Sequence, residues 1–124
     1  MYSVQASNLK LSYHSSIEFF GSRKPLPFFM VLNTLESHCN DMFRQRDGLS
    51  LFYQALCRTT EIQVENEDDE RLCHKFVDNF NAMCAPRDPF EPHYMAPFDA
   101  ALKAALELVG RIRGGHITLD SARA

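Results

Sequence analysis

Residues 66–84 read NEDDERLCHKFVDNFNAMC, and this stretch indicates a helical protein. Asn66 is a residue type that often caps a helix, and the four acidic residues after it favour the positive end of a helix dipole. Apolar residues then recur three or four positions apart, which is the spacing of one helix face. They are Leu72, Phe76, Phe80 and Met83, with Cys73, Val77 and Cys84 beside them. The sequence therefore predicts a helix that begins after Asn66 and ends before Pro86.

Two helices are predicted before this stretch. Residues 27–46 have apolar positions at helical spacing, and Asp47–Gly48 is a typical helix end. A shorter helix over residues 49–59 follows, with Leu51, Phe52, Ala55 and Leu56 on its inner face. Residues 27–59 are therefore expected to form two helices with a break at Gly48.

The last predicted helix covers residues 97–113, because proline is favoured at the first helical position and Gly114–Gly115 ends it. Charges of alternating sign, four residues apart, are expected to mark its exposed side and to pair along it. They are Asp99, Lys103, Glu107 and Arg111. Leu106 and Leu108 widen its apolar surface beyond what one neighbouring helix needs. This indicates either a deep position in a bundle or a homodimer contact through the last helix.

Short β segments are expected near both ends of the chain. Apolar residues alternate from Tyr2 onward, which is typical of a hairpin or an extended arm. Ile62 and Val64 alternate with polar residues and predict a brief strand that pairs with this arm. Residues 114–124, with Ile117 and Leu119, are expected to add an edge strand or to form a tail.

These patterns predict one domain over residues 1–124, with an arm or hairpin at 1–26, a helical core at 27–113 and a tail at 114–124. The fold is expected to be mainly α, a small bundle of about four helices. A two- or three-stranded β element from the N-terminal arm is expected beside it, and an α+β fold is the alternative.

Composition places the chain among globular proteins, because 45% of its residues are hydrophobic and 23% are charged. The formal net charge of −3 disfavours a general binder of nucleic acid or of anionic membranes. The sequence has neither a secretory-signal pattern nor an apolar run long enough to cross a bilayer. We therefore expect a cytoplasmic protein with no membrane contact, in which the four cysteines stay reduced.

Motifs for catalysis and metal binding are not found in the sequence. His38–Cys39 and Cys73–His74 are adjacent pairs, whose side chains point about 100° apart on a helix and do not easily close on one ion. No serine elbow or phosphate-binding glycine loop is present. The sequence therefore predicts no catalytic residue, no metal site, no cofactor and no enzyme activity.

The most prominent contact surface is predicted in PRDPFEPHYMAPF, residues 86–98, because its prolines break regular structure while its aromatic residues avoid water. The segment either packs against the bundle or presents its rings to a partner. Its predicted partner-binding residues are Arg87, Phe90, His93, Tyr94 and Met95. A secondary patch is predicted at Phe19, Phe20, Arg23 and Lys24. An acidic patch is predicted at Glu67, Asp68, Asp69 and Glu70, whose simpler explanation is helix capping.

The sequence thus leads to the hypothesis of a non-enzymatic protein–protein interaction module, such as an adaptor, a chaperone-like partner or a protein inhibitor. Its partner is expected to be another protein. The alternative is a nucleic-acid-associated regulator that uses basic helix ends, with contacts at Arg111, Arg113 and His116. The same basic residues also complement a helix dipole, and nucleic acid is the less expected partner.

Overall fold

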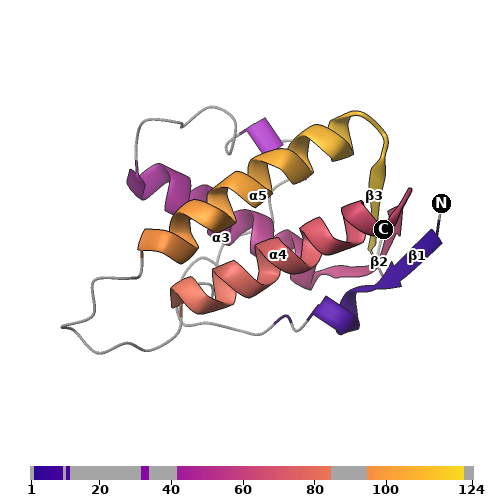
Figure 1. The fold of residues 1–124 in the computed structure, drawn as a ribbon, viewed down its shortest axis with the longest axis horizontal. Coiled ribbons are helices and arrows are strands. Elements are labelled where there is room, and N and C mark those ends of the chain that lie inside the picture. The colour runs from indigo at the N-terminus through magenta and orange to yellow at the C-terminus, as the bar shows by residue number, and fades with distance from the viewer. Residues whose placement is uncertain (1, 10, 12–31, 34–41, 85–94, 122–124) are drawn as a thin grey trace.

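The computed structural model describes residues 2–9, 11, 32–33, 42–84 and 95–121. In this part of the chain, three α-helices lie side by side and a small antiparallel sheet lies at one end of them (Figure 1). The helices are α3 (Met42–Cys57), α4 (Glu67–Cys84) and α5 (Met95–Arg113). Helices α4 and α5 form the most extensive contact, and α3 runs behind both. The expectation of a mainly helical fold with a short β element is confirmed, with three described helices in place of about four.

Helix α4 has the predicted bounds, because it follows Asn66 and ends two residues before Pro86. Its apolar face is buried as the periodicity indicated. Helix α5 ends at Arg113 as predicted but begins at Met95, two residues before Pro97. Pro97 is tolerated there because the first-turn N–H groups of a helix have no intrahelical partner.

The predicted break at Asp47–Gly48 is wrong, because α3 runs through it without interruption. Gly48 is buried within the helix, and Leu49 and Phe52 beside it are fully buried. A glycine inside a helix costs about 1 kcal/mol relative to alanine, and burial of two large side chains outweighs that cost. Of the predicted helix over residues 27–46, Leu32–Asn33 are helical, and residues 27–31 and 34–41 lie outside the described residues.

The sheet has the order β1-β2-β3, with β1 (Tyr2–Gln5) and β3 (Ile117–Ser121) on either side of β2 (Thr59–Val64). Both pairings are antiparallel, with Val4 opposite Ile62 and Ile62 opposite Leu119. The predicted pairing of the N-terminal arm with residues around 62–64 is therefore confirmed. The hairpin alternative is wrong, because Ala6–Leu9 form the 3-10 helix η1 and β1 pairs with β2 instead. Residues 117–121 are the edge strand, not a tail.

Side chains of the sheet alternate between a buried and an exposed face. Val4, Ile62, Val64 and Ile117 are buried against the helices. Ser3, Gln5 and Thr118 are exposed on the opposite face. The sheet is therefore a single layer with one apolar and one polar side, as expected for a small antiparallel sheet.

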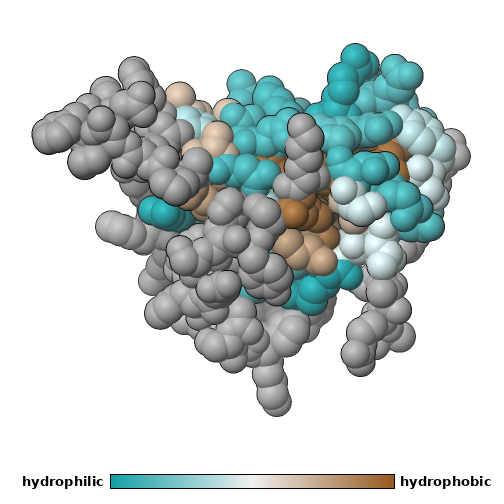
Figure 2. All heavy atoms as spheres, turned by 90° about the horizontal axis from the view of Figure 1, so that it is seen from below, coloured by the Kyte–Doolittle hydropathy of each residue, from teal (hydrophilic) through white to brown (hydrophobic). Residues whose placement is uncertain are grey.

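The core between the helices is built from aromatic rings of α3 and α4. The Phe52 and Phe76 ring centroids lie 5.1 Å apart, and Tyr53 stacks on Phe80 at 4.3 Å. The Tyr53 hydroxyl donates a hydrogen bond to the Asn81 side chain at 2.7 Å, so its polar end is satisfied. Figure 2 shows one face of the molecule, on which hydrophilic described residues gather along the upper edge and hydrophobic ones are visible near the middle.

Candidate functional site

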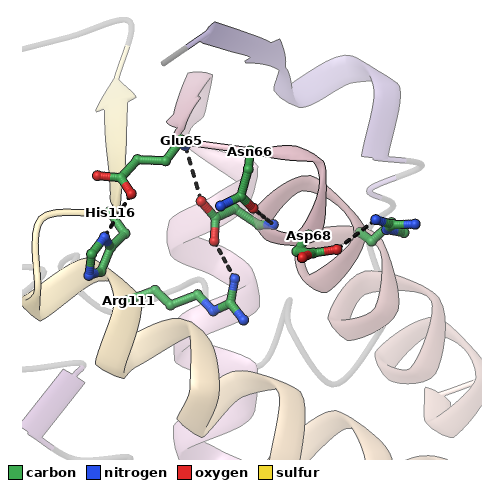
Figure 3. A network of polar contacts seen from close by, with 7 residues as sticks. Glu65, Asn66, Asp68, Arg111 and His116 are labelled. Atoms are coloured by element: carbon green, nitrogen blue, oxygen red, sulfur yellow. Dashed lines mark hydrogen bonds and ion pairs between the residues drawn. The ribbon is translucent and has the colours of Figure 1, made fainter.

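A polar network joins the β2–α4 turn to the end of α5 (Figure 3). The Asn66 side-chain oxygen accepts a hydrogen bond from the Asp69 N–H at 3.0 Å, which confirms Asn66 as the helix cap. In return the Asp69 carboxylate accepts a hydrogen bond from the Glu65 N–H at 3.0 Å. This reciprocal arrangement resembles a capping box, with aspartate in the place where glutamate is usual.

Asp69 is only 2% exposed, and its carboxylate pairs with the Arg111 guanidinium, which comes from α5. Burial by itself raises the pKa of Asp69. The Arg111 guanidinium and the N–H groups of Glu65 and Asn66 lower the pKa by more than burial raises it, so the pKa lies below its ordinary value. Asp69 is therefore ionised at neutral pH. Both of its oxygens are occupied and its basicity is low, which suits a structural ion pair better than proton transfer.

A second polar contact lies beside this ion pair. The His116 Nδ1 and the Glu65 carboxylate are 2.9 Å apart, and both side chains are about half exposed. His116 reaches this position because α5 ends in a Schellman turn, in which the His116 N–H donates to the Arg111 carbonyl at 2.9 Å and Gly115 has a φ of 81°. The network surrounds a depression of about 350 Å³, lined by Glu65, Asn66, Asp69, Arg111 and His116.

The predicted acidic patch is divided by this geometry. Glu67 and Asp68 are exposed and Glu70 is half-buried, but Asp69 points inward and does not belong to the surface. The acidic patch predicted from the sequence therefore includes one residue, Asp69, that is buried. The capping-box position, three residues after Asn66, is the sequence signal that distinguishes it from its neighbours.

Glu70 interacts with the first strand. The Tyr2 hydroxyl donates a hydrogen bond to the Glu70 carboxylate at 2.8 Å. This hydrogen bond, with smaller effects of burial and of nearby acidic residues, raises the pKa of Tyr2 to about 12. Asp68 pairs instead with Arg71 at 2.6 Å on the exposed side of α4.

The three residues predicted as nucleic-acid contacts all have partners within the chain. Arg111 pairs with Asp69, His116 with Glu65, and the Arg113 guanidinium donates to the Asn33 side chain at 2.6 Å. Two of these partners are carboxylates, which reduce the positive charge that a phosphate would meet.

Two of the described thiols are poorly suited to nucleophilic chemistry. Burial raises the pKa of Cys57 to about 11. Burial, with the negative charges of Asp69 and Glu70, raises the pKa of Cys73 to about 12. Both are therefore protonated at neutral pH, whereas the thiolate is the reactive form.

Cys57 lines a second depression of about 380 Å³ together with Gln5, Ala6, Ser7, Leu11, Thr59 and Thr60. In the described part of the chain, no three His, Cys, Asp or Glu side chains are grouped to hold a metal ion.

The two aromatic patches predicted from the sequence cannot be placed. Arg87, Phe90, His93 and Tyr94 lie outside the described residues, and Met95 is described only as the backbone at the start of α5. Phe19, Phe20, Arg23 and Lys24 lie outside the described residues as well. Both patches stay predictions.

Helix α5 presents a surface that the sequence indicated only in part. Five exposed residues between positions 99 and 110 fall within an arc of about 100° on this helix, and we call them the outer face of α5. They are Asp99, Lys103, Leu106, Glu107 and Gly110. Leu106 is 40% exposed, whereas Leu108 is 1% exposed, so only Leu108 occupies the deep position considered from the sequence.

The charged residues of this outer face do not pair along the helix as expected. Within the described residues, Asp99, Lys103 and Glu107 take part in no hydrogen bond or ion pair. Arg111, the fourth member of the predicted series, turns toward Asp69 instead. The outer face therefore combines an exposed leucine with charges that have no described partner.

Comparison of the chain with known protein families, with curated proteins and with solved structures gives no match. Among the described residues, none of the helices is both long and apolar enough to span a bilayer.

Proposed function

We propose that this protein is a non-enzymatic protein-interaction module that contacts its partner through the outer face of α5. The observation that carries this proposal is the exposure of Leu106 next to Gly110, one helical turn further on. An isolated exposed leucine is common on protein surfaces, so the residues around Leu106 matter as much as its exposure.

Gly110 has no packing role within the described structure. Apart from its chain neighbours and the adjacent backbone of α5, no described atom lies within 4 Å of the position where a Cβ would be, and the φ of Gly110 is not positive. A glycine inside a helix costs about 1 kcal/mol relative to alanine. Close approach of a partner backbone or of long partner side chains to α5 would explain why glycine, and not alanine, occupies this position.

The charges around Leu106 fit the anatomy of a contact surface. A typical interface has an apolar centre and a polar rim that shields it from water. Lys103 and Glu107 flank Leu106 on the outer face, and neither has a partner among the described residues. The outer face thus offers an anchor and two charges that are available to another chain.

The predicted contact surface at residues 86–98 immediately precedes and overlaps the start of α5 in the sequence. A partner that covers the start of α5 comes within a few residues of that segment along the chain. Phe90 and Tyr94 are therefore proposed as an extension of the same contact, and the acidic residues Glu67 and Asp68 as a separate surface. Phe98, which the segment shares with α5, is 4% exposed and belongs to the core.

The test compares capture of proteins by the immobilised wild-type chain and by Leu106→Lys. Lysine keeps the helix propensity and an aliphatic stem but adds a charge to the proposed contact. We expect the variant to lose a partner that the wild type retains, while its far-UV circular dichroism and thermal midpoint stay unchanged.

Thr118→Lys is the matched control, because it also replaces a neutral residue by lysine at an exposed position but lies on the polar face of the sheet. It is expected to capture the same partner as the wild type. Equal capture by the wild type and both variants would contradict a contact through α5.

A further inference from the structure

We infer that the partner on the outer face of α5 is a second copy of this chain, packed with its α5 antiparallel to the first. This inference rests on the proposed function and names its partner. The order of the charges along α5 supports it.

The charges of α5 are arranged symmetrically about residue 105. Lys103 and Glu107 lie two residues before and after it, and Asp99 and Arg111 lie six residues before and after it. With a rise of 1.5 Å per residue, the members of each pair are at equal heights of about 3 Å and 9 Å on either side of that level. Each pair joins an acidic and a basic residue.

A twofold axis perpendicular to α5 at this level reverses the second helix. Lys103 then faces Glu107 of the second copy, and Glu107 faces its Lys103. Asp99 likewise faces Arg111, whose side chain is 35% exposed although it is paired with Asp69. The outer face is therefore complementary in charge to its own reversed copy.

A parallel arrangement of the two helices does not have this property. A twofold axis parallel to α5 brings each residue opposite itself, so lysine meets lysine and glutamate meets glutamate. Like charges in contact oppose association. Only the antiparallel arrangement uses the charges of both helices favourably.

Leu106 lies at the edge of the antiparallel arrangement. Along α5 it is about 1.5 Å from the level of the axis, but around the helix, at about 100° per residue, it is about 80° from the direction midway between Lys103 and Glu107. The Leu106 side chains of the two copies therefore lie on opposite sides of the charge pairs, and each borders the other helix. Gly110 lies about 40° from the same direction and has open space at its Cβ position, which allows the second helix to approach closely.

One helix face buries less area than the roughly 1,600 Å² of a standard stable interface. The dimer is therefore expected to be reversible, to form at micromolar or higher concentration, and to weaken with salt because exposed ion pairs contribute to it.

The experiment measures the dissociation constant by sedimentation velocity over a range of concentrations. Lys103→Glu and Glu107→Lys, each alone, turn two attractive pairs into two repulsive ones and should raise the dissociation constant at least tenfold. The double variant Lys103→Glu/Glu107→Lys should return to within about threefold of the wild type. An equimolar mixture of the two single variants should form a heterodimer, because two acidic positions of one then face two basic positions of the other.

Lys75→Glu is the matched control, because it makes the same charge reversal at an exposed position on α4. It should leave the dissociation constant unchanged. A wild-type chain that stays monomeric up to millimolar concentration overturns the inference, and so do single reversals that neither the double variant nor the mixture corrects.

The two proposals can fail separately. If the wild type is monomeric but Leu106→Lys still loses a captured protein, the outer face is a contact surface for a different partner and only the second-copy inference fails. If the wild type is monomeric and Leu106→Lys captures the same proteins as the wild type, both proposals fail.

Discussion

Asp69 shows how a single residue can have a different role from its neighbours. It lies in a run of four acidic residues, but it alone occupies the third helical position after the Asn66 cap. Its carboxylate therefore turns back toward the chain, where the Glu65 N–H and the Arg111 guanidinium stabilise its charge. This ion pair joins the start of α4 to the end of α5.

We expect Asp69→Asn to lower the free energy of unfolding by about 2 kcal/mol at neutral pH. Removing one partner of a buried ion pair leaves the other charge uncompensated, and partial exposure of Arg111 moderates that cost. Urea denaturation followed by far-UV circular dichroism measures the difference. Asp68→Asn is the matched control, because it makes the same change at an exposed neighbour and should cost less than about 1 kcal/mol.

The stability difference between the wild type and Asp69→Asn is also expected to depend on pH. Because the pKa of Asp69 is lower in the folded state than its ordinary value of 3.8, its contribution is present above 3.8 and is lost as the pH falls through the folded pKa. The difference in stability between wild type and Asp69→Asn should therefore be constant near neutral pH and shrink only below 3.8. A difference that persists unchanged in acid would show that the charge of Asp69 does not matter.

At the scale of elements, one glycine inside α5 and one just after it have opposite requirements. Gly110 lies inside the helix with open space around it, whereas Gly115 has a φ of 81°, a conformation that other residues rarely adopt. We expect Gly110→Ala to raise the free energy of unfolding by about 0.5–1 kcal/mol and Gly115→Ala to lower it by about 1–2 kcal/mol. Each variant serves as the control for the other, because the substitution is the same.

Thermal or urea unfolding at low protein concentration, where association does not contribute, measures both effects. Destabilisation by Gly110→Ala in the monomer would mean that the chain itself requires glycine there. That result would remove the main reason for assigning this glycine to a partner contact.

The elements differ in how well the sequence predicted them, and the reason is the range of the interactions that form them. Helix α4 was predicted with its true bounds because its cap, its apolar face and Pro86 are all local signals. Helix α3 was divided wrongly because Gly48 is a local signal for a break that burial overrides. For the residues of β3, the sequence could not decide between an edge strand and a tail, because the partner strand β2 lies more than fifty residues away.

At the scale of the whole molecule, the polar network could not be predicted from the sequence. Asp69 and Arg111 are 42 residues apart, and no sequence pattern predicts that they are in contact. The sequence therefore assigned Arg111 to an exposed stripe or to nucleic acid. The outer face of α5 was partly predicted, because helical spacing placed its charges together, but the difference between Leu106 and Leu108 depends on where α4 packs.

The aromatic core is the part of the molecule that connects α3 with α4. Phe76 of α4 contacts Phe52 of α3 at 5.1 Å between ring centroids and lies 6.0 Å from Phe80. All three side chains are fully buried. Loss of the Phe76 ring would leave a cavity between the two helices, next to the stacked Tyr53 and Phe80 rings.

We expect Phe76→Ala to lower the free energy of unfolding by about 3–5 kcal/mol, whereas Phe76→Leu, which fills most of the space, should cost about 1 kcal/mol. The chain has no tryptophan, so its near-ultraviolet circular dichroism comes from tyrosine and phenylalanine and reports on this core. If α3, α4 and the sheet unfold together, the near- and far-ultraviolet signals should have the same urea midpoint in both variants, since a single cooperative domain loses its packing and its helices at once. A near-ultraviolet transition that precedes the far-ultraviolet one would show that the helices persist without the core, and a loss below about 1 kcal/mol in Phe76→Ala would show that Phe76 is not central to it.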